Sequence, residues 1–137
     1  MIILFDGCDK VGKGTLINAI HKVTDYEHVI FDRGIASNYV YGKFKKRKHP
    51  LEELLMYDEE LSKHKFVKQI ILVADKKDLI KRFKKHNETD LKLNEISKVL
   101  KLYNEYSNIT RIDTLVLDTS KNSLQSCVNQ ILKWINK

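Results

Sequence analysis

Proline and glycine are scarce in this sequence, with one proline and five glycines among 137 residues. Together with a hydrophobic fraction of 42%, this scarcity argues against a disordered chain. Apolar runs of membrane-spanning length are also lacking. Met1 leads directly into a short strand-like run, without the basic start and long apolar stretch of a signal peptide. We therefore expect a globular protein with neither a membrane span nor a secretion signal.

Cysteine is also scarce, and acidic residues are outnumbered by basic ones. The two cysteines, Cys8 and Cys127, lie far apart and form no metal-ligand pair, so we expect reduced thiols in a cytoplasmic protein. Acidic residues number 18 against 25 Lys and Arg, which gives a net charge of +7 and favours anionic partners. The alternative is a solvated lysine-rich surface. The one dense cluster, Lys43–Lys48, lacks the interleaved aromatics of a single-strand binding surface, so nucleic acid is an alternative rather than the favoured partner.

Hydrophobic patterning predicts alternating strands and helices. Apolar runs predict four buried strands, each followed by an aspartate, at Ile2–Phe5, Val29–Phe31, Gln69–Ala74 and Thr114–Leu117. Helical spacing predicts helices at Thr15–Val23, 51–64, Lys77–His86, Leu91–Tyr106 and Ser123–Ile135. This alternation predicts one α/β domain over residues 1–137, with three layers and a parallel sheet of about four strands. Ligands of such sheets bind beyond the carboxyl ends of the strands, where the four aspartates lie.

The most specific motif is the loop between the first strand and the first helix. The string from Gly7 to Lys13 fits G-x-x-x-x-G-K, the phosphate loop of P-loop NTPases. Glycines let successive backbone N–H groups point at phosphate oxygens, the following helix adds its positive end, and Lys13 adds a point charge. The expected nucleotide-binding residues of this loop are Gly7, Asp9, Lys10, Val11, Gly12, Lys13, Gly14 and Thr15. Gly14 stands where a Mg²⁺-binding Ser or Thr is usual, and "GKGT" resembles the adenylate kinase loop, in which Thr15 would bond the α-phosphate.

A second segment, "VIFDRGIASNYVYG" at residues 29–42, places Asp32-Arg33 at the end of the second strand. With the phosphate loop, it resembles the thymidylate kinases and, more loosely, the deoxynucleoside kinases. Those families pair an "EGxDGxGKxT" loop with a "DRYxxSxxAYQ" segment. The resemblance implies Mg²⁺-dependent transfer of the ATP γ-phosphoryl group to a nucleoside or, preferably, a nucleoside monophosphate.

The resemblance also implies roles for individual residues. Asp9 would approach the acceptor and the metal, Asp32 would bind Mg²⁺ or act as base, and Arg33 would clamp the acceptor phosphate. Ser37 and Tyr41 would bind the acceptor, with a helix cap and a packed aromatic as the structural alternatives.

Later segments are less specific. "LVADKKDLIKRFKKHNETD" resembles the start of the kinase lid, from which Arg82, Lys84, Lys85 and Lys81 would close over the transferring phosphate; a solvated basic helix face is the alternative. "LVLDTSKNSLQSCVNQIL" resembles the last strand and the adenine-contacting loop, which would place Thr119, Ser120 and Lys121 beside the purine. Capping of the last helix explains Thr119 or Ser120 equally well.

The sequence departs from the family at the acceptor side. Gly34 replaces an aromatic, and "HKVTDYEH" joins the first helix to the Asp-Arg strand where the kinases insert further elements. Two alternatives follow: a kinase for a bulkier acceptor such as a polynucleotide 5′ end, or a nucleotide-binding module without turnover. The helix after Pro50 has an apolar face that is either a homodimer interface or an ordinary core face.

Overall fold

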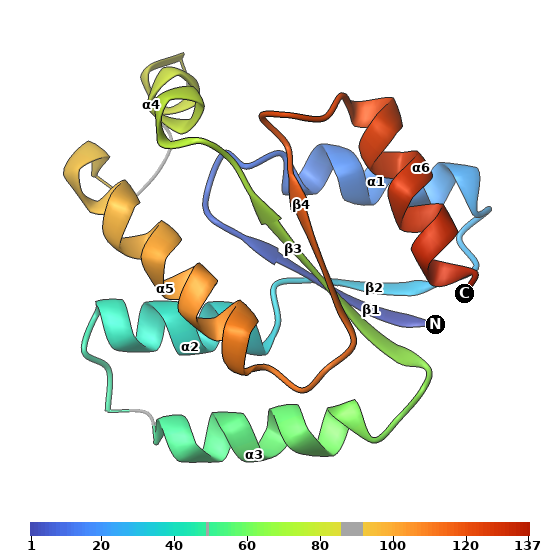
Figure 1. Cartoon of the computed structure of the whole chain (residues 1–137), viewed down its shortest axis with the longest axis horizontal. Coiled ribbons are helices and arrows are strands. Elements are labelled where there is room, and N and C mark those ends of the chain that lie inside the picture. Colours follow the sequence, from blue (N-terminus) through green and yellow to red (C-terminus); the bar gives the residue numbers. More distant parts are fainter. Residues whose placement is uncertain (49, 86–91) are drawn as a thin grey trace.

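A parallel four-stranded sheet forms the middle of the molecule (Figure 1). The structure, a computed structural model, describes residues 1–48, 50–85 and 92–137. Within them the strands follow the spatial order β2-β1-β3-β4 and comprise β1 (Ile2–Gly7), β2 (Val29–Asp32), β3 (Val67–Val73) and β4 (Thr114–Asp118). Every neighbouring pair is parallel, with Phe5 opposite Asp32 and Gly7 opposite Leu72. This confirms the prediction of a parallel sheet of about four strands. The phosphate-loop strand β1 lies inside the sheet, beside the Asp-Arg strand β2.

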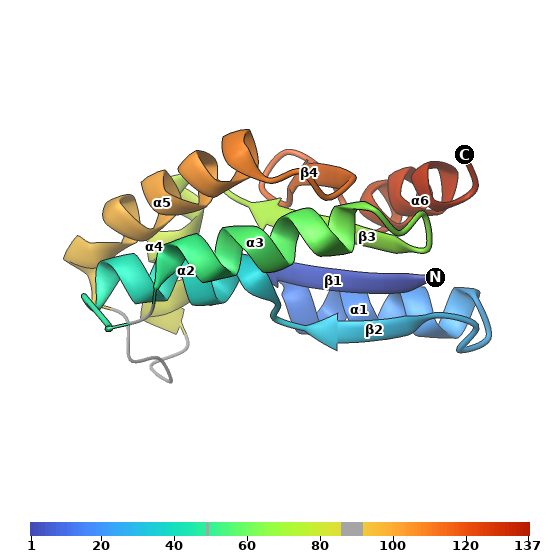
Figure 2. The same ribbon diagram turned by 90° about the horizontal axis from the view of Figure 1, so that it is seen from below.

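Helices cover both faces of the sheet (Figures 1 and 2). One face carries α1 (Lys13–Val23) and α6 (Leu124–Ile135), which contact each other, and the other carries α2 (Ile35–Phe44), α3 (Leu51–Ser62) and α5 (Ile96–Ile109). The short α4 (Lys76–Lys85) follows the carboxyl end of β3. The result is the three-layer α/β architecture that the sequence predicts. None of the helices in the described part of the chain combines the length and apolarity that crossing a membrane requires.

Burial differs between the central and the edge strands. The central β1 and β3 are almost wholly buried, whereas β2 exposes most of its residues, with Val29 55% and Phe31 51% exposed. The prediction of a buried strand is therefore wrong for β2. This strand lies at the sheet edge, and an apolar composition alone does not distinguish an edge strand from a central one. The other edge strand, β4, is only partly buried.

One helix is missing from the prediction, and several helix ends differ. Helix α2 was not predicted, although it packs between α3 and α5. Helix α1 begins at Lys13 instead of Thr15, and α5 follows a short 3₁₀ turn at Leu93–Glu95. The predicted helix ends at His86 and Leu91 lie outside the described residues. Cys8 and Cys127 are both buried and free of disulfides.

Candidate functional site

The loop after β1 has the backbone conformation of an anion cradle. Gly7 has φ +153°, and a Cβ there would lie 2.7 Å from the Leu72 carbonyl oxygen of β3, so only glycine fits. Lys10 adopts a left-handed conformation with φ 65°, and Gly12 is the N-cap of α1. Within the described residues no side chain caps α1, so its first-turn N–H groups and the positive end of its dipole face the loop. This arrangement suits a phosphate.

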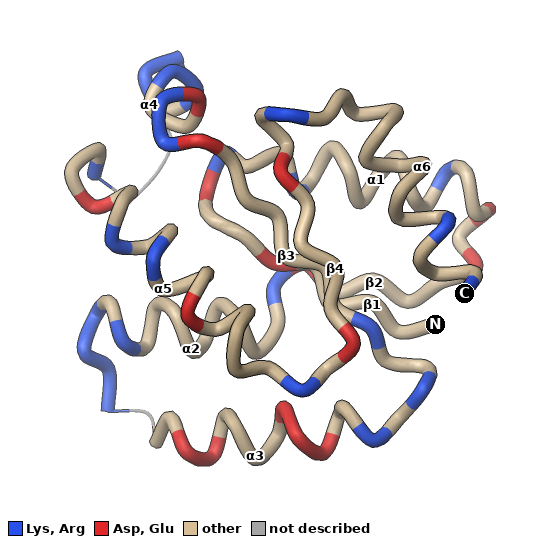
Figure 3. The backbone as a smooth tube through the Cα atoms, viewed as in Figure 1, with Lys and Arg blue, Asp and Glu red and all other residues tan. Residues whose placement is uncertain are grey.

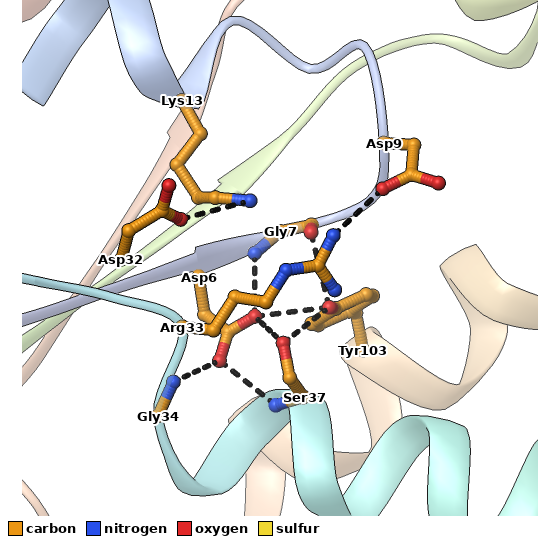
Figure 4. A network of polar contacts seen from close by, with 9 residues as sticks. All are labelled: Asp6, Gly7, Asp9, Lys13, Asp32, Arg33, Gly34, Ser37 and Tyr103. Carbon is orange, nitrogen blue, oxygen red and sulfur yellow. Dashed lines mark hydrogen bonds and ion pairs between the residues drawn. The ribbon is translucent and has the colours of Figure 1, made fainter. Parts of the chain in front are cut away.

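Lys13 and Asp32 form an ion pair beside this loop (Figure 4). The Lys13 Nζ lies 3.2 Å from Asp32 Oδ1. The lysine side chain is only 10% exposed, whereas the aspartate side chain is 60% exposed. Because β1 and β2 are neighbours in register, the start of α1 and the end of β2 meet at the same end of the sheet. The carboxylate thus faces solvent while the ammonium is held at the loop.

Arg33 occupies a strained backbone position and reaches the phosphate loop. Its φ of 80° is left-handed, which a non-glycine residue rarely adopts. Its N–H donates to the Phe5 carbonyl oxygen at 2.8 Å, and its guanidinium donates to Asp9 Oδ1 at 2.8 Å. Partial burial alone would lower the pKa of Arg33, but the Asp9 carboxylate outweighs it and the pKa is raised. The strained turn aims the side chain at the loop (Figure 4).

Asp6 links β1, the start of α2 and α5 through hydrogen bonds to its buried carboxylate. It is fully buried, and its carboxylate accepts hydrogen bonds from the N–H groups of Gly7 at 2.9 Å, Gly34 at 3.0 Å and Ser37 at 2.8 Å. It also accepts from the Ser37 hydroxyl at 2.5 Å and the Tyr103 hydroxyl at 2.9 Å (Figure 4). Burial, and next the Asp6 charge, raise the pKa of Tyr103. A β1 carboxylate therefore caps α2, which fixes Arg33 next to the phosphate loop.

A cavity of about 310 Å³ opens beside Arg33. It is lined by Asp9, Arg33, Gly34, Ser37, Asn38, Tyr41, Phe44, Lys45 and Arg47. The Arg33 guanidinium carbon lies 5.8 Å from the Tyr41 ring centroid. The Tyr41 hydroxyl oxygen is buried without a hydrogen-bond partner among the described residues, and burial raises its pKa. We call this space the acceptor-side cavity, after the acceptor-binding role that the sequence predicts for Arg33, Ser37 and Tyr41.

A second cavity, of about 230 Å³, lies on the other side of the phosphate loop. Its lining combines loop, α1, α4 and α6 residues: Lys10, Val11, Gly12, Thr15, Leu16, Arg82, Thr119, Asn122, Leu124 and Cys127. Arg82 donates to the Lys10 carbonyl oxygen at 3.0 Å and to Thr119 Oγ1 at 3.2 Å. The Thr119 hydroxyl donates to the Val11 carbonyl oxygen at 2.7 Å. We call this space the donor-side cavity, after the nucleotide-binding role that the sequence predicts for its loop residues. The phosphate loop contributes to both linings, with Asp9 on the acceptor side and Lys10, Val11 and Gly12 on the donor side.

Comparison with known proteins identifies the family of this chain. No protein-family model matches it. The SPbeta prophage-derived uncharacterized protein YorR of Bacillus subtilis (strain 168) is 30% identical over 124 residues, which cover 90% of this chain and 74% of YorR. The chain belongs to the YorR family.

Solved structures that share its fold include two with nucleotides bound. The crystal structure of Bacillus subtilis YorR in complex with phosphorylated GDP has a TM-score of 0.81 at 22% identity, covering 99% of this chain and 96% of that one. Deoxyadenosine kinase from M. mycoides, with dCMP and a flexible dCDP bound, has a TM-score of 0.59 at 18% identity, covering 99% of both chains. This YorR-family chain therefore has the P-loop kinase fold of a nucleoside kinase. The finer likeness to thymidylate kinases stays a resemblance.

The predicted residues divide between the two cavities. Asp9, Arg33, Ser37 and Tyr41 all line the acceptor-side cavity, but the Ser37 hydroxyl donates to Asp6. Arg82 lines the donor-side cavity, on the far side of the loop from Arg33. Five further residues that were predicted to bind the nucleotide line the donor-side cavity. They are Lys10, Val11, Gly12 and Thr15 of the phosphate loop and Thr119 of the loop after β4.

Other predicted residues lie outside both cavities. The Ser120 hydroxyl donates to Asp118 at 2.5 Å and accepts from the Asp75 N–H at 3.0 Å, while Lys121 lies 3.9 Å from Asp118. Neither lines the donor-side cavity. The alternative that Thr119 or Ser120 caps the last helix is wrong, because Ser123 is the N-cap and accepts from the Ser126 N–H.

Sequence reasoning missed several lining residues. Asn38, Phe44, Lys45 and Arg47 come from α2 and its end, and α2 itself was not predicted. Asn122 gave no motif signal, although its position after the last strand could have singled it out. Gly34 is explained by packing, because a Cβ there would lie 3.3 Å from the Leu4 Cβ.

The predicted metal ligands are already engaged with cations. Asp9 pairs with Arg33, and Asp32 pairs with Lys13. The part of the chain that the structure describes contains no group of three His, Cys, Asp or Glu able to hold a metal alone. An exposed carboxylate beside a phosphate loop fits Mg²⁺ that arrives with a nucleotide, because Mg²⁺ takes one or two carboxylates and completes its shell with phosphates and water.

Proposed function

We propose that this chain is a kinase that transfers the γ-phosphoryl group of ATP to a nucleoside monophosphate or a nucleoside. One observation carries the proposal: the phosphate loop lies between two cavities, and Lys13, Asp32 and Arg33 converge beside it. The donor base would occupy the donor-side cavity, and the acceptor would occupy the cavity beside Arg33. Catalysis of phosphoryl transfer consists mainly of positioning and charge neutralisation, which these groups can provide.

The ligands of the compared proteins support a nucleotide substrate. YorR was solved with phosphorylated GDP, and the deoxyadenosine kinase was solved with dCMP and dCDP as products. We infer that this chain also binds a nucleotide with its phosphates on the loop.

In the proposed reaction an acceptor oxygen forms a bond to the γ-phosphorus, and the bond to the β–γ bridging oxygen breaks. ADP leaves with the bonding electrons. Arg33 would neutralise the acceptor phosphate, and Lys13 would hold the β- and γ-phosphates. With a hydroxyl acceptor, the exposed Asp32 carboxylate would take the proton. Mg²⁺ that arrives with the nucleotide would supply further charge neutralisation. Asp9 would help to hold it, and so would Asp32 where the acceptor is a phosphate and no base is needed.

The second candidate is a nucleotide-binding module without turnover. The ion pairs that occupy Lys13 and Arg33 favour it, because both cations are already neutralised. Gly14, which stands where a hydroxyl ligand to the metal is usual, also favours it.

Acceptor-dependent release of ADP from ATP separates the two candidates. The assay screens nucleosides and nucleoside monophosphates with the intact chain. We expect Arg33→Ala to lower kcat/KM about a thousandfold, the scale of losing a charge-stabilising arginine. Lys22→Ala, on the exposed last turn of α1, is the matched control and should leave kcat/KM unchanged. Binding of ATP without ADP release for any acceptor would decide for the module.

A further inference from the structure

The acceptor-side cavity has cations at both ends of α2. Arg33 precedes the helix, and Lys45 and Arg47 follow it. Lys45 Nζ lies 5.9 Å from the Tyr41 ring centroid, and the Arg33 guanidinium carbon lies 5.8 Å from the same centroid. Two cationic groups therefore approach one aromatic ring in the cavity wall.

The turn after α2 directs these side chains selectively. The Lys46 N–H donates to the Lys43 carbonyl oxygen and the Arg47 N–H donates to the Gly42 carbonyl oxygen, the two bonds of a Schellman motif. Lys46 holds the left-handed position of that motif, with φ 49°. Lys45 and Arg47 line the cavity, whereas Lys46 between them does not. The backbone thus separates adjacent cations into two that line the cavity and one that does not.

The charges lining this cavity do not balance. Among the residues that the structure describes, Asp9 is the one carboxylate that lines it, and it is paired with Arg33. Lys45 and Arg47 form no ion pair with the carboxylates that the structure describes. An uncharged ligand would leave both cations without a counter-ion. In the proposed reaction the reacting 5′ end of the acceptor lies at Arg33, so an anion there does not occupy Lys45 and Arg47. The remaining positive charge matches a second anionic group.

The rest of the lining suits a nucleoside between the two charged ends. Tyr41 and Phe44 form an edge-to-face aromatic pair with centroids 6.5 Å apart. The Asn38 amide offers both a donor and an acceptor, and the buried Tyr41 hydroxyl has no partner among the described residues. Aromatic surface with a few polar groups is typical of a small-molecule site.

We propose that the acceptor is a nucleotide that carries a 3′-phosphate bound by Lys45 and Arg47, while its 5′ oxygen lies at Arg33 and receives the γ-phosphoryl group. This inference rests on the proposed function. The same chemistry is offered by a free nucleoside 3′-phosphate and by the 5′-terminal nucleotide of a polynucleotide. In either case the 5′ oxygen bonds to the γ-phosphorus and ADP leaves; a 5′-hydroxyl also gives up its proton to Asp32.

The test compares acceptors that differ only in the 3′-phosphate. ADP release is measured with a nucleoside and its 3′-phosphate, with a 5′-monophosphate and the 3′,5′-bisphosphate, and with a short oligonucleotide. We expect kcat/KM to be at least tenfold higher for the members that carry the 3′-phosphate. Where that preference is found, comparison of the free 3′-phosphates with the oligonucleotide identifies which of the two sources the chain uses better. A ratio near one within each matched pair overturns it.

Variants assign the effect to the two cations. Lys45→Gln combined with Arg47→Gln should bring the ratio between paired acceptors to about one, whereas Lys46→Gln should preserve it. Urea unfolding checks that the double variant folds, and the single variants replace it if it does not. A ratio that survives in the folded double variant contradicts the assignment.

Binding without ATP separates this inference from the proposed function. Calorimetry compares the 3′,5′-bisphosphate with the 5′-monophosphate for the wild type and the double variant. If no acceptor releases ADP, the kinase proposal fails, while tighter binding of the bisphosphate that is lost in the double variant would still support the cation site. If ADP is released but neither binding nor turnover favours the 3′-phosphate, only the further inference fails.

Discussion

Asp6 shows how one buried side chain can organise a site that it does not enter. Its carboxylate collects donors from β1, from the start of α2 and from α5. An uncapped helix end and a buried carboxylate are each costly alone, and here each satisfies the other. As a result, the backbone of Arg33 is held between β1 and α2, which fixes the distance from its guanidinium to the phosphate loop.

Replacing Asp6 should therefore destabilise the whole fold. We expect Asp6→Ala to lower the free energy of unfolding by about 3 kcal/mol, because several buried donors lose a charged acceptor. Ser37→Ala removes one hydroxyl and should cost about 1 kcal/mol. Urea unfolding of both variants measures the difference. Similar costs for the two variants would show that the carboxylate is not the centre of the network.

Replacing Asp32 should strengthen the metal-free binding of ATP but slow phosphoryl transfer. Its exposed carboxylate neutralises Lys13, so Asp32→Asn frees the ammonium for phosphate oxygens. An ion pair with one exposed partner contributes about 0.2–1 kcal/mol, so metal-free ATP affinity should rise about 1.4- to fivefold. Phosphoryl transfer should fall at least about a hundredfold with the loss of the proposed base and metal ligand.

A fluorescent ATP analogue titrated in the presence of a chelator measures that affinity, and ADP release measures the transfer. Asp25→Asn is the matched control, since Asp25 is exposed in the turn after α1 and its left-handed φ of 53° suits asparagine. Weaker metal-free binding by Asp32→Asn would show that this carboxylate does not compete with phosphate for Lys13.

At the scale of elements, the glycines of the phosphate loop differ in what they do. Gly7 lies where β1 pairs with β3, and its missing Cβ makes room for the Leu72 carbonyl. Gly14, in the first turn of α1, has no heavy atom within 4 Å of an added Cβ. Gly7 thus allows the close approach of β1 and β3, whereas an added Cβ at Gly14 would meet open space.

Alanine at these two positions should change stability in opposite directions. Gly7→Ala combines overpacking with backbone strain and should lower the free energy of unfolding by about 3 kcal/mol. Gly14→Ala should raise it by about 0.5 kcal/mol, because alanine is the better helix former. Urea unfolding without nucleotide measures both values. A stabilising Gly7→Ala or a strongly destabilising Gly14→Ala would contradict the loop geometry.

The sequence predicts an element well where burial alone determines the spacing of its apolar residues. Apolar runs revealed β1 and β3 because both strands are buried, and amphipathic spacing revealed α1, α3 and α6. Helix α2 escaped because it buries residues around much of its circumference, including Ser37 and Gly42, and its cap comes from Asp6 instead of a neighbouring residue. The cavity lining contributed by α2 and the following turn was lost with it.

For the whole molecule, the distribution of charge follows the layout of the fold. Lys and Arg gather on α4, at the start of α5 and in the connection between α2 and α3, toward the carboxyl ends of the strands, whereas α3 carries Asp and Glu (Figure 3). The net charge of +7 is thus not spread evenly in space, although lysines are spread along the sequence. Composition predicted an anionic partner, and only the folded arrangement indicates where that partner would approach.

The same fold makes stability sensitive to alkaline pH. Burial, followed by the Asp9 charge, raises the pKa of Cys8 to about 12, and burial is also the largest cause of the raised pKa values of Tyr41, Tyr103 and Tyr106. The folded protein therefore keeps these protons to higher pH than the unfolded chain does. The stabilisation is complete below about pH 9 and is lost as pH rises toward 12, because the unfolded state binds fewer protons there.

Urea unfolding between pH 7 and pH 11 should thus show a free energy of unfolding that falls above about pH 9, with tyrosinate absorbance rising as the protein unfolds. Tyr106→Phe should flatten the slope, because it removes a hydroxyl that donates to Asp58 at 2.5 Å and titrates only after the fold opens. Tyr57→Phe is the matched control, since this exposed side chain lies on α3. A flat profile to pH 11 would mean that the buried thiol and hydroxyl groups ionise without opposing the fold, which contradicts their burial around the phosphate loop and α5.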